Sequence, residues 1–360
     1  MIQVHHGNCL DVMAGIPDAS VHCCITSPPY YALRDYGIRP CQWPEVTFKP
    51  MIGVPEITIP AMECVHGLEP GIMAFVAHEV AIFREVYRVL RPDGAIWVNL
   101  GDTYTNSGGL GLGGNISRSN RAHKQRAIRC GLEPGFHGKD KFATPWRVVM
   151  ALQADGWILR QDVIWEKPCP VPESAKDRCT NAHEFVFLLA KGRRYYWDKS
   201  AMLEATSGTA HARAKVPASW GRGEEPRNSL LLQTQETRDR RKGRRSNKLA
   251  KAGSGVRSNE SFDLAVTQVV ERRNRRSVWK ISPEPSSIPH FAMFPTKLAK
   301  LCLLAACPPG GTVLDPFAGS GTVGRVAAET GRRGILIEAS EKYVGYIRER
   351  LMVTPELGLQ

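Results

Sequence analysis

Residues 312–322 read TVLDPFAGSGT, and this stretch decides the fold of the 360-residue chain. Its apolar start predicts a short buried strand over Thr312–Asp315, and the pattern that follows predicts a helix over 322–330. Between them, Gly319 and Gly321 let the backbone approach a ligand closely, and free N–H groups at the helix N-terminus can bind it. No Gly-Lys-Ser/Thr follows, so the stretch is not a Walker-type phosphate loop.

The segments on either side continue the alternation of helix and strand. Helices are predicted over Thr296–Ala306 and 341–351, and a second strand over 334–338. This order is a βαβα unit of a doubly wound parallel sheet. Glu338 ends the second strand, where an acidic side chain can hydrogen-bond a ribose diol.

A second candidate ligand-binding stretch lies near the N-terminus. The apolar run Val21–Thr26 predicts a buried strand, and Ser27-Pro28-Pro29-Tyr30 follows it directly. Proline lacks an N–H group and cannot continue a central strand. The chain therefore leaves the sheet there with a stiff backbone, at the carboxyl edge where α/β proteins bind ligands.

The other patterned segments complete an α/β architecture. Strands are predicted over 95–100, 157–165 and 185–190, and helices over 72–90 and 145–154. The breaker sequence Arg91-Pro92-Asp93-Gly94 ends the longer helix. We expect one mostly parallel sheet with helices on both faces.

The net charge of +13 is unevenly distributed. Residues 205–280 hold 18 Lys and Arg against 7 Asp and Glu, with few periodic apolar positions. Such a segment points to a polyanionic partner, although a solvated basic loop would have the same composition. The Gly-, Ser- and Asn-rich residues 106–120 predict a mobile loop, which could cover a site at the sheet edge or simply connect two elements.

Composition argues against membrane, secreted and metal-binding classes. No run approaches the roughly 18 apolar residues of a membrane span, and the first residues do not form a signal peptide. The ten cysteines are scattered and read as reduced cytosolic thiols. Cys41, Cys64 and His66 could ligate a metal, but there is no CxxC pair and no obvious fourth ligand, so we expect no metal.

The run Ser27-Pro28-Pro29-Tyr30 resembles the catalytic loop of the DNA amino-methyltransferases, which carry Asp, Asn or Ser before Pro-Pro and an aromatic residue. The Ser form is most similar to the enzymes that methylate N4 of cytosine. Residues 312–322 resemble the family's S-adenosylmethionine loop, and the order of catalytic loop, basic region and cofactor loop resembles the beta arrangement. The resemblance implies a Rossmann-like, S-adenosylmethionine-dependent methyltransferase sheet with an inserted basic target recognition region.

The resemblance also implies a domain organisation. Residues 1–204 would form the catalytic half of the methyltransferase domain, with an insert at about 39–68 and the loop at about 106–120. Residues 205–280 would form the basic target recognition region, and 281–360 the cofactor-binding half of the same domain. Residues 99–104, 165–168 and 183–184 match further family motifs, the last two around the target-base pocket.

Roles for single residues follow from the same resemblance. The Ser27 hydroxyl and the Pro28 carbonyl would accept the hydrogens of the exocyclic amine, Pro29 would stiffen the loop, and Tyr30 would stack on a base flipped out of the duplex. Cofactor contacts are expected from Asp11, Phe294, Pro295, Asp315, Phe317, Ala318, Gly319, Ser320, Gly321, Thr322 and Glu338. DNA contacts are expected from Arg240, Arg241, Lys242, Arg244, Arg245, Arg272, Arg273, Arg275 and Arg276.

Several alternatives stay open. Methylation of adenine N6 uses the same geometry, more often with Asp at the position of Ser27. Methylation of cytosine C5 would need a cysteine nucleophile, and Cys169 lies outside the expected motif order. Methylation of protein glutamine or RNA uses related loops, and a catalytically silent DNA-binding protein would need a damaged loop, whereas both loops are intact.

The expected partner is double-stranded DNA, methylated by base flipping at a recognition sequence that cannot be read from an irregular insert. A cognate restriction endonuclease is a possible partner but is not required. We expect a monomer or dimer in the cytoplasm, bacterial or phage-encoded, which works at the nucleoid and has no membrane partner.

Overall fold

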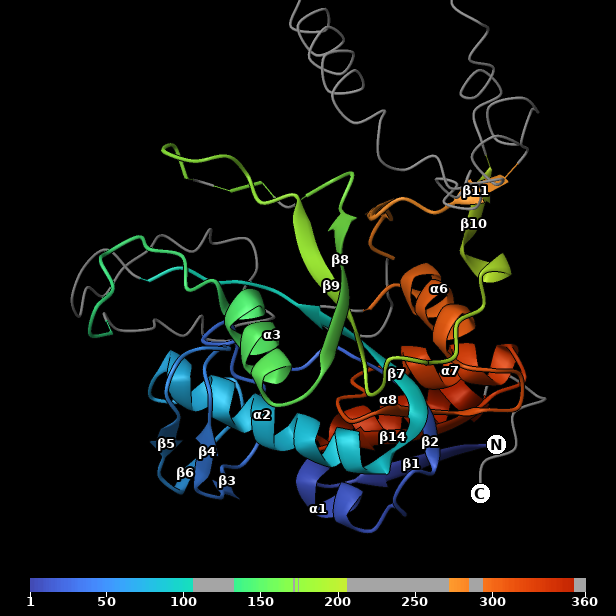
Figure 1. Cartoon of the computed structure of the whole chain (residues 1–360), viewed down its shortest axis with the longest axis horizontal. Helices are drawn as coiled ribbons and strands as arrows, with labels where there is room; N and C mark the ends of the chain where they lie inside the picture. The colour runs from blue at the N-terminus through green and yellow to red at the C-terminus, as the bar shows by residue number, and fades with distance from the viewer. Residues whose placement is uncertain (106–132, 171, 174, 206–271, 285–293, 353–360) are drawn as a thin grey trace, which may run out of the picture. The chain divides into compact units, whose positions relative to one another are not determined.

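The computed structural model describes residues 1–105, 133–170, 172–173, 175–205, 272–284 and 294–352. The chain divides into two compact units, one formed by Met1–Met202 with Arg276–Gln360 and the other by Leu203–Arg275. The predicted alternation of strands and helices is confirmed in the first unit (Figure 1). No helix among the described residues is long and apolar enough to span a bilayer.

An eight-stranded sheet, in the order β1-β14-β13-β2-β7-β9-β8-β12, forms the centre of the first unit. Every pair of neighbours is parallel except that β9 runs antiparallel to both β7 and β8. The carboxyl ends of β14, β13, β2 and β7 therefore meet at one edge of the sheet. The strands are β1 (Ile2–His6), β2 (Val21–Thr26), β7 (Leu90–Leu100), β8 (Ile158–Glu166), β9 (His183–Ala190), β12 (Val278–Lys280), β13 (Thr312–Asp315) and β14 (Arg333–Glu338).

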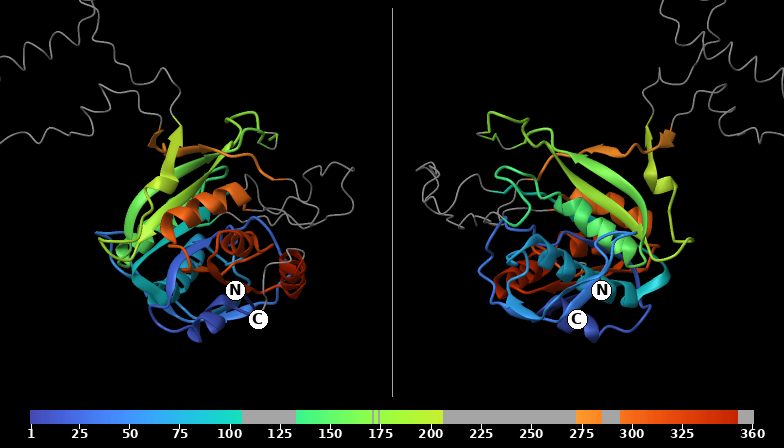
Figure 2. Two further views of the ribbon diagram at one scale, coloured as in Figure 1. Left: turned by 90° about the vertical axis from the view of Figure 1, so that its right-hand side faces the viewer. Right: turned by 60° about the vertical axis from the view of Figure 1, so that its left-hand side comes forward.

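Helices cover both faces of this sheet, each over its own apolar core. α1 (Cys9–Ala14), α2 (Ile72–Val89) and α3 (Thr144–Ala154) contribute to the first core. α6 (Thr296–Ala306), α7 (Thr322–Glu329) and α8 (Glu341–Met352) contribute to the second. Strands β8 and β9 stand between the green α3 and the orange α6 in Figure 1, and Figure 2 shows these layers from two further sides.

The insert predicted at about 39–68 is not only loop. It contains two short antiparallel strand pairs, β3 (Cys41–Trp43) with β6 (Met62–Cys64) and, between them in the chain, β4 (Val46–Phe48) with β5 (Ile57–Ile59). Trp43 and Phe48 of these strands are buried in the same core as α2. Because α2 is covered by the insert as well as by the sheet, it buries even His78 and Glu79 completely.

The predicted element boundaries match those observed to within a few residues. Outside the insert and the second unit, sequence analysis missed β1, α1 and β12, of which β1 and β12 lie at the edges of the sheet. The breaker sequence 91–94 does end α2 at Val89, yet these residues form the extended start of β7, since Leu90 pairs with Val21.

The second unit is described only at its two ends. There β10 (Leu203–Ala205) pairs antiparallel with β11 (Arg272–Asn274), and the Arg273 guanidinium binds the Glu204 carboxylate at 2.9 Å. Most of the predicted target recognition region, and the predicted loop at 106–120, lie outside the described residues.

Gly324 marks the close approach of α7 to the sheet. A Cβ atom added at Gly324 would lie 2.4 Å from Leu336 Cδ1 and 3.2 Å from Leu336 Cγ. Leu336 is fully buried on β14, inside the second core. Only glycine therefore allows this helix to pack so closely on its strand.

We expect Gly324→Ala to lower the free energy of unfolding by about 1–3 kcal/mol, as overpacking of a filled core does. Gly345→Ala is the matched control, because it lies in α8 with open space around its Cα and should raise stability by about 0.5–1 kcal/mol. Urea unfolding of both variants measures the difference. Equal stability of G324A and the parent protein would contradict the packing argument.

Candidate active site

Neighbouring strands bring the two predicted loops together at the carboxyl edge of the sheet. β2 ends at Thr26 and β13 at Asp315, and Leu314 pairs with Cys24 in the register between them. The Thr26 hydroxyl donates a hydrogen bond of 2.8 Å to Asp315 Oδ1 across 289 residues of sequence. The strand pairing thus places Ser27 beside the Gly-rich loop.

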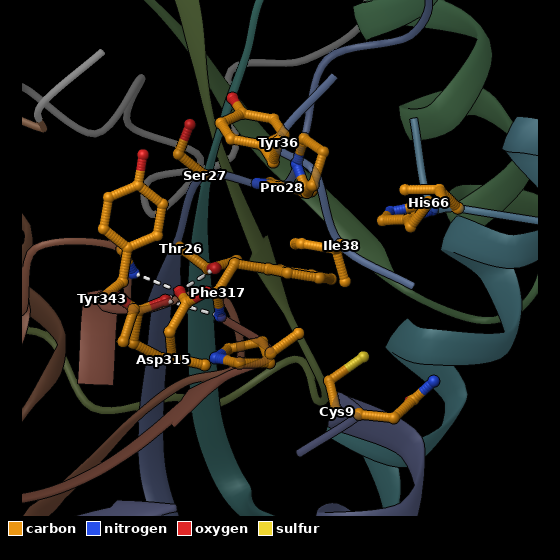
Figure 3. A pocket seen from close by; sticks show the side chains of 18 of the residues that line it. Cys9, Thr26, Ser27, Pro28, Tyr36, Ile38, His66, Asp315, Phe317 and Tyr343 are labelled. Atoms are coloured by element: carbon orange, nitrogen blue, oxygen red, sulfur yellow. Dashed lines mark hydrogen bonds between the residues drawn. The ribbon is translucent and has the colours of Figure 1, made fainter. Parts of the chain in front are cut away.

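A cavity opens between these loops, and Figure 3 shows its walls from close by. Ser27 and Pro28 lie on one side of it, with Asp315 and Phe317 on the other. The cavity is lined by the predicted catalytic residues Ser27, Pro28, Pro29 and Tyr30 and by the predicted cofactor residues Phe294, Asp315, Phe317, Ala318, Gly319, Ser320, Thr322 and Glu338.

The carboxyl group of Asp315 is buried at the base of the cavity. Burial raises the pKa of Asp315 to about 7, although the Thr26 hydroxyl and the Phe317 N–H, at 3.1 Å, favour its ionised form. No described cationic side chain forms a salt bridge with it. A carboxyl group that ionises near neutral pH beside a cavity suits a ligand that carries positive charge.

Glu338 fixes the shape of the Gly-rich loop and also lines the cavity. The Gly319 N–H donates to Glu338 Oε2 at 2.8 Å, and the Ser340 N–H donates to Oε1 at 2.9 Å. Burial raises the pKa of Glu338 above its ordinary value. Gly319 and Gly321 have φ values of 52° and 77°, a left-handed conformation that glycine adopts without strain.

The aromatic ring of Tyr30 packs against the backbone at Gly101, the residue that follows β7. A Cβ atom at Gly101 would lie 2.2 Å from Tyr30 Cε2, so glycine is required there. The Tyr30 hydroxyl donates to Glu184 Oε2 at 2.6 Å and lies 3.1 Å from Asn99 Oδ1. Burial and the Glu184 carboxylate raise the pKa of Tyr30, which therefore keeps its proton and acts as a donor.

Ser27 is half-buried at the start of the Pro-Pro loop. Its Oγ lies 3.4 Å from Asn99 Oδ1 and 3.5 Å from the Tyr30 hydroxyl. β7 lies beside β2, and Val98 pairs with Thr26. The residues that follow this pair, Asn99 and Ser27, therefore meet through their side chains. The serine hydroxyl thus has an acceptor within the protein for its single hydrogen.

A buried network of histidines and glutamates supports the wall of the cavity behind Phe317. The His66 ring donates through Nδ1 to Glu69 at 2.9 Å and through Nε2 to Glu79 at 2.8 Å, and it stacks on Phe317 with ring centroids 5.5 Å apart. Burial alone would lower the pKa of His66, but the two carboxylates raise it to about 10. The protonated imidazole and its partners hold the Phe317 ring in place.

The suggested metal set of Cys41, Cys64 and His66 is not brought together as ligands. Both ring nitrogens of His66 are hydrogen-bonded to carboxylates, and Cys41 Sγ donates to the Cys64 carbonyl at 3.6 Å. Cys64, Glu69 and His78 do place one potential ligand atom each within 4.8 Å of the others, but Glu69 already accepts from His78 at 3.0 Å. Within the same cluster, His78 Nε2 and Glu79 Oε2 are buried and have no hydrogen-bond partner among the described residues.

Three predicted cofactor residues lie outside the cavity lining. Asp11 is exposed on α1, and Asn8 lines the cavity instead while its side chain caps α1 by accepting from the Leu10 N–H at 2.8 Å. Pro295 and Gly321 are the N-cap residues of α6 and α7.

The predicted DNA contacts are only partly described. Arg240, Arg241, Lys242, Arg244 and Arg245 lie outside the described residues. Arg272 and Arg276 are exposed and Arg275 is half-buried, whereas the charge of Arg273 is balanced by Glu204.

Sequence reasoning missed several residues that shape the site. Tyr36, Ile38 and Tyr343 line the cavity from the chain after the Pro-Pro turn and from α8. Asn99 and Glu184 contact the catalytic loop from β7 and β9. Both lie in stretches that match family motifs, but only the order and register of the strands reveal that they meet.

Comparison with known proteins places the chain among methyltransferases. A family model described as DNA methylase, for N6 and N4 methyltransferases, matches residues 21–349. The chain is 34% identical over 346 residues to the type II methyltransferase M.SmaI of Serratia marcescens. The matched region covers 96% of this chain and 89% of that protein. The chain is 35% identical over 345 residues to M.Cfr9I of Citrobacter freundii, with 96% and 86% covered.

Solved structures share the fold. The PvuII DNA methyltransferase, described as cytosine-N4-specific, superposes with a TM-score of 0.54 at 18% identity, over 97% of this chain and 86% of that one. A putative DNA modification methylase from Thermus thermophilus, in complex with S-adenosyl-L-methionine, superposes with a TM-score of 0.51 at 20% identity. The superposition covers 100% of this chain and 99% of that one.

Asp315 makes binding of a cationic ligand dependent on pH. Below pH 7 the free protein holds Asp315 protonated, so a cation such as S-adenosylmethionine must displace that proton. We expect affinity to rise between about pH 5.5 and 7, by up to about tenfold per unit, and then to level off. Calorimetry at several pH values measures this slope. In Asp315→Asn the slope should flatten, and an unchanged slope would contradict the role of Asp315.

Proposed function

The chain belongs to the N6/N4 DNA methylase family, and from this premise we propose that it methylates the exocyclic N4 of cytosine at specific sites in duplex DNA. S-adenosylmethionine is the methyl donor. The observation that carries the proposal is the position of Ser27 and Pro28, which face the Gly-rich loop after Asp315 across one cavity. Substrate amine and methyl donor can thus be held at opposite walls of the same cavity.

The residues around the cavity fit the cofactor. Asp315 offers a carboxylate without a cationic partner among the described side chains, and Glu338 offers carboxylate oxygens suited to ribose hydroxyls. Phe294, Phe317 and Tyr343 supply aromatic walls. When bound, S-adenosylmethionine supplies an electrophilic methyl group, so the protein has to orient the acceptor rather than activate the donor.

The catalytic loop orients the acceptor amine. An exocyclic amine has two N–H bonds, and its lone pair is partly shared with the ring. Ser27 Oγ and the Pro28 carbonyl can each accept one of these hydrogens, which favours a more tetrahedral nitrogen with its lone pair directed out of the ring plane. Pro28 and Pro29 have no N–H groups and fixed φ angles, so the carbonyl stays aimed.

DNA is the substrate that the family membership and the charge distribution support. An exocyclic amine is paired inside the duplex, so the target base has to be flipped out to reach the cavity. The surplus of Lys and Arg in residues 205–280 supports contact with phosphates, and among the described residues Arg272 and Arg276 are exposed for it. Cytosine rather than adenine is proposed because Ser, not Asp, precedes the Pro-Pro pair.

The proposal is tested by identifying the methylated nucleoside. We would incubate the full chain with S-adenosylmethionine and whole-genome-amplified DNA, which carries no methyl groups, digest the DNA and analyse nucleosides by mass spectrometry. N4-methylcytosine is the expected product. N6-methyladenine would overturn the assignment of the base, and the absence of any methylated nucleoside would overturn DNA as the substrate.

The same assay tests Ser27. Ser27→Ala should lower the single-turnover rate by about 10²–10³-fold, the usual effect of removing one polar group that acts on the reacting atoms. Binding of S-adenosylmethionine should stay near its native value. Ser20→Ala is the control and should keep full activity, because Ser20 is exposed and its hydroxyl donates to the nearby Pro17 carbonyl at 2.6 Å.

A further inference from the structure

Four side chains beside Ser27 form a hydrogen-bonded group centred on Glu184, which we call the Glu184 network: Tyr30, Asn99, Lys167 and Glu184. Glu184 Oε2 accepts from the Tyr30 hydroxyl at 2.6 Å and from Asn99 Nδ2 at 3.1 Å. Lys167 binds the other oxygen, Oε1, in a salt bridge. The contacts proposed so far for the cofactor and for the acceptor amine do not explain why these four side chains are joined.

The network determines the orientation of the Asn99 amide. Asn99 is 2% exposed, and its Nδ2 group lies 3.1 Å from Glu184 Oε2 and 3.1 Å from the Phe185 carbonyl. Both partners accept hydrogen bonds only, so the NH₂ group must face them and Oδ1 must face the opposite way. There, Oδ1 meets the hydroxyls of Ser27 and Tyr30.

The hydroxyls of Tyr30 and Ser27 donate their hydrogens to different acceptors. Tyr30 has one hydrogen, and its 2.6 Å contact with a carboxylate is shorter and stronger than its 3.1 Å contact with the Asn99 amide oxygen. Asn99 Oδ1 is therefore left for the hydrogen of Ser27 at 3.4 Å. This distance is long, as hydrogen bonds at active sites often are before the substrate is bound.

The hydroxyl of Ser27 is thereby committed to one role. A serine that donates its hydrogen to Asn99 presents only lone pairs elsewhere and can accept from an amine. If the amide were reversed, Asn99 would offer an N–H to Ser27, and the serine hydrogen would be free to point at the substrate nitrogen. A hydroxyl turned that way competes for the lone pair that has to attack the methyl group.

We propose that Glu184 is a positioning residue of the methyl transfer, which sets the Asn99 amide so that Ser27 acts as an acceptor. Lys167 assists by holding Oε1 of the carboxylate, with its ammonium 4.7 Å from the centre of the Trp165 ring. This inference rests on the proposed function only in that the protein transfers a methyl group to an amine in DNA. It applies equally to cytosine and adenine.

The test is a double-mutant cycle on the full chain with amplified genomic DNA and radiolabelled S-adenosylmethionine. Glu184→Gln should reduce the single-turnover rate by about 10²-fold, the effect of a misplacement of about 1 Å. Its affinity for S-adenosylmethionine in calorimetry should be native. In a Ser27→Ala background, Glu184→Gln should cause no further loss, because the two changes act through one hydroxyl.

Glu85→Gln is the matched control. Glu85 also forms a partly buried salt bridge, with Arg88 at 2.9 Å, but it lies near the end of α2, at the opposite end of the sheet from Ser27. It should keep native activity. If E184Q does not fold, Glu184→Asp, which keeps the charge but shortens the reach, replaces it in the same cycle.

Two outcomes would overturn the inference: an E184Q variant as active as E85Q, or a loss of equal size with and without Ser27. The second would indicate that Glu184 supports the fold in general and not the hydroxyl. Failure of the proposed function is seen separately, as absence of methyl transfer by the unmodified protein.

Discussion

The hydrogen bond from Thr26 to Asp315 is the contact on which the rest of the site depends. It joins the ends of two neighbouring strands that are 289 residues apart in the chain. Both groups are almost fully buried, so removing either partner would take a hydrogen bond away from a buried polar group. On one side Asp315 begins the loop that Glu338 holds in shape, and on the other Thr26 leads into Ser27. The pairing of β2 with β13 therefore sets the distance between the Pro-Pro loop after Thr26 and the Gly-rich loop after Asp315.

The carboxylates around the cavity differ in their partners, and this difference separates their roles. Glu69 and Glu79 share the protonated His66, and Glu184 binds Lys167, so each of these carboxylates has a cationic partner within the protein. Asp315 and Glu338 receive hydrogen bonds from a hydroxyl and backbone N–H groups instead. The carboxylates with cationic partners contact aromatic and amide side chains, whereas the other two line the cavity, where the proposed cofactor would bring positive charge and hydroxyl groups.

Sequence alone predicted the two loops, their strands and their common edge, because fully buried strands with abrupt ends such as Val21–Thr26 and Thr312–Asp315 leave a clear pattern. It could not predict the contacts of Asn99 with Glu184, which depend on the antiparallel β9 lying beside β7 in one particular register. It could not show that Asn8 rather than Asp11 lines the cavity, because the six-residue α1 is too short to show which of its sides faces the cavity. The buried hydrogen bond between His66 and Glu79 was not predicted, because charged residues are rarely found buried in a helix that is packed on both sides.

The central claim is that the two loops form one site, and hydrogen exchange of the full chain with and without S-adenosylmethionine tests it most directly. Peptides that cover 26–34 and 315–322 should both exchange more slowly with the cofactor bound, because one ligand contacts both sides of one cavity. A peptide from α3, residues 144–154, should not change. Slower exchange at 315–322 alone, with 26–34 unaffected, would show that the loops bind independently and would contradict the account.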